Sequence, residues 1–187
     1  METTTKSANR PSTQWQEEQE QILREWADKA MCFKWLHSKS HESFSYRHAM
    51  FTIPVIILST ITGTANFALE RFDEDVKSIA VMFIGTLNIF TGILSTVAQF
   101  LKIAEINEGH RVASISWDKF YRVIKIELAK ASKDRRSPKD LIRQCQEEYD
   151  RLVETSPSIQ QRVIDRFNDL ELSPAIQKPE ICGTLLP

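Results

Sequence analysis

Residues that break or crosslink a chain are scarce in this sequence. Its 187 residues include five glycines, seven prolines and three cysteines. The cysteines (Cys32, Cys145 and Cys182) are odd in number and share no motif spacing, so we expect free thiols and neither a disulfide framework nor a zinc site. The formal net charge is only −1, and no basic tract is present, so nothing in the sequence indicates binding to nucleic acid.

The motifs of common enzymes are also missing. There is no glycine-rich phosphate loop, no nucleophile elbow and no paired-cysteine motif, so we expect no enzyme and no cofactor. His37 and His41 are four residues apart and could hold a metal on one helix, but the glutamate after His41 does not give the His-Glu-x-x-His pattern. Histidines at a membrane surface are the simpler interpretation. We predict no catalytic, cofactor-binding or metal-ligating residue.

Charge is absent from two long stretches in the middle of the chain. His48–Leu69 is 22 residues long and Ser78–Leu101 is 24, and neither contains Asp, Glu, Lys or Arg. A bilayer core about 30 Å thick needs about 20 apolar helical residues to cross it. The connector Glu70–Lys77 has eight residues, six of them charged. Residues 48–101 therefore predict a transmembrane hairpin with spans at about 50–69 and 78–101. A soluble protein with two buried core helices is the weaker alternative.

The flanks on both sides of the hairpin predict further helices. No segment shows a strand pattern, so the predicted fold is all-α, with long amphipathic helices from both flanks. Residues 1–12 are expected to be disordered, 13–47 to form an amphipathic helix from a capping box at Thr13 and Gln16, 102–170 to be helical, and 171–187 to be irregular. Ser137-Pro138 and Ser156-Pro157 are predicted helix starts.

One apolar stripe continues from the second span without a stop signal, which predicts a helix that also continues. Its members recur at spacings of three and four: Ile106, His110, Ala113, Trp117, Phe120, Ile124 and Leu128. Such a stripe packs against another helix, either as a coiled coil or within the same chain, and we favour packing within the chain.

Thr52 and Pro54 interrupt the helical pattern where the first span begins. A proline inside a helix loses one hydrogen bond and clashes with the carbonyl four residues earlier. Either Thr52 caps a new helix with Pro54 in its first turn, or one long helix kinks there. We favour a helix break at membrane entry.

The distribution of Lys and Arg predicts the orientation of the hairpin. The connector carries two cations, whereas the 20 residues before and after the spans carry seven: Lys29, Lys34, Lys39, Arg47, Lys102, Arg111 and Lys119. Cytoplasmic flanks are enriched in such cations. We expect both termini on the cytosolic side and the acidic connector 70–77 on the opposite side.

Each span carries a polar stripe. Ser59, Gly63 and Asn66 lie on one line in the first span, and Asn88, Gly92, Ser95 and Gln99 in the second. Unpartnered amides in hydrocarbon cost several kcal/mol each. These stripes must face protein, as helix-packing surfaces, or water, as the lining of a pore formed by several copies. In either case we expect a homo-oligomer in a lipid bilayer.

Four segments, and the sequence from the second span onward, share a pattern with a known family. They are Ile22–Ala30, Trp35-Leu36-His37, Phe51–Pro54 and Thr62–Phe67, and the pattern continues through the second span and Lys102–Leu128. These segments resemble the SLATT family of two-span helical membrane proteins, in the form carried by large DNA viruses. The resemblance implies a pore-forming or channel-like protein. Because no nucleotide-sensing domain is attached, the alternative is a structural virion membrane protein. Its cytosolic helices would then anchor an inner membrane to capsid or other membrane-associated proteins.

Overall fold

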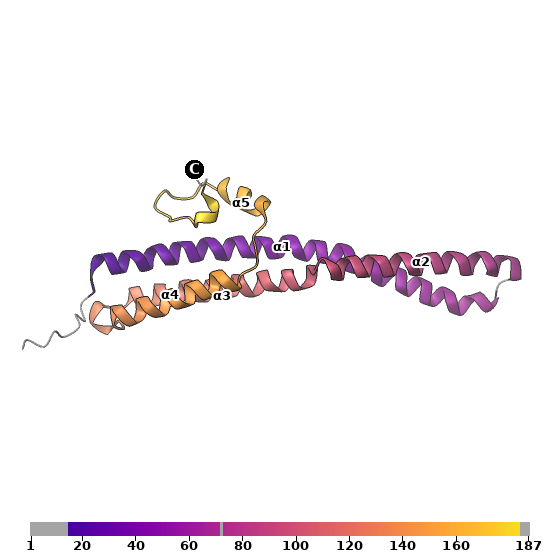
Figure 1. Cartoon of the computed structure of the whole chain (residues 1–187), viewed down its shortest axis with the longest axis horizontal. Coiled ribbons are helices and arrows are strands. Elements are labelled where there is room, and N and C mark those ends of the chain that lie inside the picture. The colour runs from indigo at the N-terminus through magenta and orange to yellow at the C-terminus, as the bar shows by residue number, and fades with distance from the viewer. Residues whose placement is uncertain (1–14, 72, 184–187) are drawn as a thin grey trace, which may run out of the picture. The chain divides into compact units, whose positions relative to one another are not determined.

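The computed structural model describes residues 15–71 and 73–183, and these residues are almost entirely helical (Figure 1). No strand occurs among them, so the all-α prediction is confirmed for this part of the chain. The expected disorder of residues 1–12 and the capping residue Thr13 lie outside it. The elements are α1 (Glu17–Ala68), η1 (Leu69–Arg71), α2 (Glu74–Phe100), α3 (Ile103–Ala129), η2 (Ser132–Asp134), α4 (Pro138–Thr155), α5 (Gln161–Asn168) and η3 (Glu180–Cys182).

The chain divides into two compact units, which are described separately. The bundle unit contains the described parts of Met1–Leu36, Ala113–Ser156 and Ile164–Pro187. The hairpin unit contains His37–Val112 and Pro157–Val163.

Trp117 lies at the centre of the bundle unit. Its side chain is fully buried, it stacks on Phe33 with ring centroids 4.6 Å apart, and its Nε1–H donates to Ser156 Oγ at 3.1 Å. Tyr149 of α4 meets the same ring edge-on at 5.4 Å. The buried face of α3 in this unit is the predicted stripe, from Ala113 through Ile124. Packing within the chain is therefore confirmed for this stretch.

Polar contacts link the end of α3 to the loop that follows it and to α1. Arg135 donates to the carbonyl oxygens of Leu128 and Lys130 at 2.9 Å each, and it also bonds the carboxylate of Glu20. The nearly buried Glu127 accepts from the Arg136 backbone N–H at 2.7 Å and from Lys130 Nζ at 2.8 Å. The carbonyls of Leu128 and Lys130, at and just after the end of α3, therefore have hydrogen-bond partners, and these bonds hold the following loop in place.

All three cysteines are free thiols, as the sequence predicted, and the structure shows that all three are buried. Burial raises the pKa of Cys32 and of Cys145 to about 11. Thiols in that state are protonated at neutral pH and are poor nucleophiles.

In the hairpin unit, α1 and α2 run antiparallel, joined through η1 (Figure 1). The stretches Glu17–Arg71 and Glu74–Ala129 each include a segment long and apolar enough to cross a membrane. Only 6% of the first segment and 11% of the second is buried within the chain.

The expected helix break at Thr52 and Pro54 is wrong. α1 continues through both residues, with Pro54 inside it. The Thr52 hydroxyl does not cap a helix, because it lies 3.4 Å from His48 Nε2, one turn earlier on the same helix. Neighbouring helices and side chains can satisfy the backbone group that a proline frees, and helices in membranes tolerate proline for this reason.

Two other boundaries also differ from the predicted ones. The helix after the second span does not run on, because Leu101 and Lys102 separate α2 from α3 and Lys102 has φ of +49°. Ser156-Pro157 does not start a helix directly, since α5 begins at Gln161. Pro157 instead packs against Gly109: a β-carbon at Gly109 would lie 3.3 Å from the proline ring.

Candidate functional site: the polar face of the hairpin

A seam of buried and half-buried residues runs along the hairpin. On α1 and α2 these positions recur at alternating spacings of three and four, the pattern by which two helices pack side by side. Thr62, Ile84 and Thr91 are the most buried, at 2%, 8% and 8% exposure. The positions that follow this alternating spacing, which we call the seam, are Val55, Leu58, Thr62 and Ala65 on α1, Leu69 in η1, and Ala80, Ile84, Leu87, Thr91, Leu94 and Ala98 on α2.

The polar atoms inside this seam are satisfied by their own helices. The Thr62 hydroxyl donates to the carbonyl of Leu58 at 2.9 Å, and the Thr91 hydroxyl donates to the carbonyl of Leu87 at 2.8 Å. A threonine hydroxyl reaches the carbonyl four residues earlier without leaving its helix. The contact between the two helices therefore needs no polar partner from outside the hairpin.

The predicted stripe residues lie beside the seam, not in it. Each directly follows a seam residue in sequence, and a helix turns about 100° per residue, so each is displaced from the seam in the same rotational sense. Antiparallel helices are related by a two-fold axis across their seam, which places equivalent positions of both on one side. We call this side the polar face. Its residues are Ser59, Gly63, Asn66, Gly85, Asn88, Gly92, Ser95 and Gln99.

Sequence reasoning found each stripe separately but missed that they share a face, and it missed Gly85. The regularity is visible once the seam is known, because every polar-face residue directly follows a seam position. Only Ile56, Glu70 and Val81 at equivalent positions depart from the small and amide side chains. The opposite side holds the residues that directly precede the seam. They are mainly large and apolar, as Ile61, Phe83, Phe90 and Val97 illustrate.

The polar face is open within one chain. Asn66, Asn88 and Gln99 are exposed, and no side-chain hydrogen bond to them is found among the described residues. A β-carbon built on Gly63, Gly85 or Gly92 would meet nothing within 4 Å. These glycines are therefore not required for packing α1 against α2.

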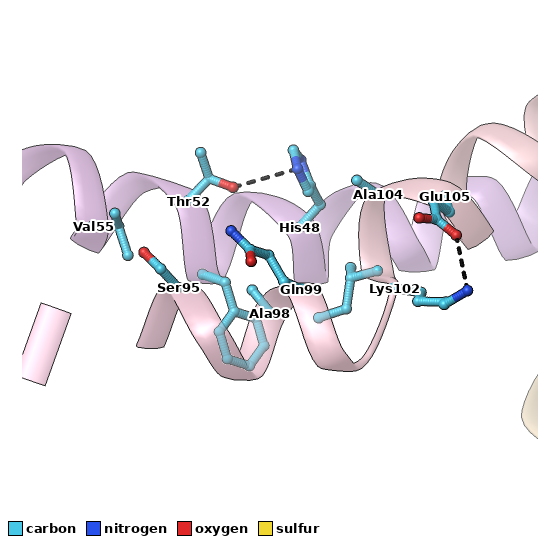
Figure 2. A pocket seen from close by; sticks show the side chains of 11 residues that line it. His48, Thr52, Val55, Ser95, Ala98, Gln99, Lys102, Ala104 and Glu105 are labelled. Carbon is cyan, nitrogen blue, oxygen red and sulfur yellow. Dashed lines mark hydrogen bonds and ion pairs between the residues drawn. The ribbon is translucent and has the colours of Figure 1, made fainter. Parts of the chain in front are cut away.

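A cavity of about 540 Å³ lies at the end of the polar face nearest Lys102 (Figure 2). Thr52 and His48 of α1 face Ser95 and Gln99 of α2 across it. Its other walls are Phe51, Val55, Ala98, Lys102, Ile103, Ala104 and Glu105. Lys102 Nζ lies 3.5 Å from a carboxylate oxygen of Glu105, and both side chains are mostly exposed.

A buried histidine pair lies elsewhere in the hairpin unit. His37 Nδ1 and His110 Nδ1 are 2.9 Å apart, and the rings are 1% and 0% exposed. Phe44 stacks on His110 with centroids 5.3 Å apart. Burial lowers the pKa of His37 to about 3, with a further contribution from His110, and it lowers the pKa of His110 to about 4, with a contribution from His41.

The sequence grouped these histidines differently. It placed His37 with His41, whereas the structure brings His37 to His110, 73 residues later, and directs His41 Nδ1 to the backbone oxygen of Asn107 at 3.2 Å. Within residues 15–71 and 73–183, no group of three or more His, Cys, Asp or Glu side chains could hold a metal ion.

Comparisons of this chain with models of known protein families, with curated proteins and with solved structures find no match.

Proposed function

We propose that this chain is an integral membrane protein whose two-span hairpin self-associates through the polar face. The first support is the exposure of the spans. Ile57, Phe83 and Phe90 are each more than half exposed, among many large apolar side chains along α1 and α2. Soluble monomers rarely expose contiguous apolar surface of this extent. Lipid tails are as apolar as these side chains, so a bilayer accommodates such a surface.

The orientation follows from charge. Seven cations flank the spans on the side of the termini and two lie in the connector, so the termini are assigned to the cytosolic side, or its equivalent in a virion. The acidic connector 70–77 then lies on the opposite side.

The observation that carries self-association is the open polar face. Asn66, Asn88 and Gln99 have no hydrogen-bond partner in the described part of the chain, and hydrocarbon offers none. Amides of neighbouring copies can bond each other, and glycines allow their helices to approach closely. Two helices alone cannot enclose a channel, so an aqueous pore lined by this face requires several copies. We propose this pore-forming assembly, in agreement with the SLATT resemblance.

Cysteine crosslinking in membranes tests the assembly. Ser59→Cys on the polar face is expected to give disulfide-linked dimers on mild oxidation. Thr64→Cys is the matched control, because it lies on the same helix, is also exposed and precedes the seam residue Ala65. Equal crosslinking of both variants, or of neither, contradicts the proposed interface.

Conductance separates a pore from a purely structural assembly. Purified oligomer in planar bilayers is expected to conduct ions, and Asn88→Leu to reduce that conductance. Crosslinked oligomers that do not conduct would favour the alternative, a virion membrane protein that anchors a membrane to a protein shell. One feature of the bundle unit fits that alternative: Ile115 and Ile126 are 54% and 62% exposed on the outer side of α3, where a partner could bind. Crosslinking of this face to capsid proteins in purified virions would support it.

A further inference from the structure

The cavity at the end of the polar face has a polar wall and an apolar wall. Phe51, Val55 and Ala98 make the apolar wall. Figure 2 shows Gln99 extending from α2 into the space that faces His48 and Thr52 of α1. Thr52 and Gln99 each supply a hydrogen-bond donor, and Lys102 lies at the edge, with its ammonium directed to Glu105 (Figure 2). A volume of about 540 Å³ is large enough for a small polar group.

Backbone donors add to this wall from a third direction. Ile106 N–H bonds the carbonyl of Lys102 at 3.0 Å, which closes the first turn of α3. The N–H groups of Ile103, Ala104 and Glu105 precede that bond, so they have no helical carbonyl to pair with. These three residues line the cavity. The positive end of the α3 dipole therefore lies beside the Lys102 ammonium.

We propose that this cavity binds a phosphate group. The recognising chemistry is one ammonium, one side-chain amide, hydroxyl groups and backbone N–H donors along the polar wall, which suits a tetrahedral anion with several acceptor oxygens. Glu105 is the internal competitor. Its carboxylate occupies Lys102 when the cavity is empty, and a phosphate takes its place on the ammonium.

The phosphate has two possible sources. If the chain spans a membrane as proposed above, Lys102 lies just beyond the second span, at the level of phospholipid headgroups. The lipid source thus rests on the proposed function, whereas a phosphate in solution could reach the same cavity without it. The two sources share their contacts and differ in whether acyl chains contribute to the affinity.

The experiment measures binding to the purified full chain in detergent by calorimetry and native mass spectrometry. The probes are inorganic phosphate and a short-chain phosphatidic acid, with a diacylglycerol of the same chain length as a control. Lys102→Gln is expected to weaken phosphate binding by roughly tenfold or more. Glu105→Gln is expected to tighten it several-fold, because the competing carboxylate is gone. Lys102→Gly also removes the amine. Lys102 has a positive φ, which glycine adopts readily, so this variant is expected to fold.

A matched pair of controls lies at the other end of α2. Lys77 and Glu74 form an i, i+3 ion pair at 3.4 Å, as Lys102 and Glu105 do at 3.5 Å, but they line no part of the cavity. Lys77→Gln and Glu74→Gln are expected to leave binding unchanged. Affinity that does not respond to Lys102, or that falls in Glu105→Gln, overturns the phosphate site.

The two probes then assign the source. Tighter binding of phosphatidic acid than of inorganic phosphate, with no binding of diacylglycerol, identifies a lipid headgroup. Equal affinity identifies a soluble phosphate, and binding of diacylglycerol alone overturns the proposal. If the chain binds no phosphate, the Ser59→Cys crosslinks are still expected to form. If the chain does not insert into a membrane, alkaline extraction releases it.

Discussion

His37 and His110 face each other through their Nδ1 atoms, 2.9 Å apart and shielded from solvent. One ring must donate and the other accept, and because burial keeps both imidazoles neutral, they adopt opposite tautomers. A proton added to the accepting nitrogen would place two donors against each other in a site that does not solvate charge. The pair therefore links the stability of the hairpin unit to pH.

We predict that acidification below about pH 6.5 destabilises the hairpin unit. The folded pKa values, about 3 and about 4, lie below the unfolded value of 6.5, so the unfolded chain binds more protons as pH falls. Each histidine then removes about 1.4 kcal/mol of unfolding free energy per pH unit below 6.5. Thermal unfolding in detergent between pH 7.5 and 5.5 measures this effect above the range in which carboxylates titrate. His110→Gln should give a shallower slope than the parent; an unchanged slope contradicts the assignment.

We predict opposite effects of Gly92→Ala on the monomer and on the oligomer. The added β-carbon meets nothing within 4 Å in the single chain, and alanine favours a helix over glycine by about 0.5–1 kcal/mol. The monomer should gain stability, while an interface formed by close helix approach should weaken. Val97→Ile adds a methyl group on the opposite side as a control. Circular dichroism under dissociating conditions and sedimentation equilibrium report the two quantities, and stronger association of Gly92→Ala would exclude a close approach there.

We predict that Asn88→Leu reduces association while the folded hairpin remains intact. The amide has no partner within the described part of the chain, so its removal costs the monomer nothing, but it removes a bond between copies worth about 1 kcal/mol. Thr86→Val is the comparison on the other side of α2; its hydroxyl bonds its own helix at 2.9 Å. Sedimentation equilibrium should separate the two variants. Equal association in both would assign Asn88 no role in the interface.

We predict that Trp117→Ala destabilises the bundle unit by about 3–5 kcal/mol, because it empties the fully buried site between Phe33 and Tyr149. Trp26→Ala should cost less, since Trp26 is only half-buried and its ring stacks on Tyr149 at the longer distance of 6.0 Å. Denaturant unfolding followed by circular dichroism compares them. A larger loss in Trp26→Ala would contradict the packing described for Trp117.

We predict that Lys102→Gly stabilises the turn between α2 and α3 by about 1 kcal/mol. Lys102 adopts φ of +49°, which is unfavourable for a residue with a β-carbon and natural for glycine. Lys102→Ala keeps the β-carbon and should bring no such gain. Thermal unfolding of the two variants tests this, and equal melting temperatures would show that the backbone there is not strained.

Local patterns predicted most of the helices. The lengths of the uncharged stretches, the Ser137-Pro138 start and the stripe from Ala113 through Ile124 depend on neighbours in sequence, so they could be read directly. The errors came at two positions where the local signal and the observed backbone disagree. Pro54 carries a strong breaking signal, yet α1 continues through it, and Lys102 carries no breaking signal, yet the helix stops there.

The candidate site required information that one helix does not contain. Each polar stripe was visible on its own span. That both lie on one side follows only from the seam, and the seam depends on which residues of α1 and α2 are buried against each other. The contact of His37 with His110 likewise joins positions 73 residues apart, which no spacing rule connects.

The self-sufficient seam and the open polar face together imply an order of events. Thr62 and Thr91 complete their hydrogen bonds within their own helices, so a single hairpin that inserts as proposed needs no second copy to satisfy them. In the proposed assembly its amides find partners only when another copy arrives, and the frequency of that encounter rises with the number of copies per unit area of membrane. The amount of protein made, acting through mass action, would then decide when the assembly forms, with no need for a separate trigger.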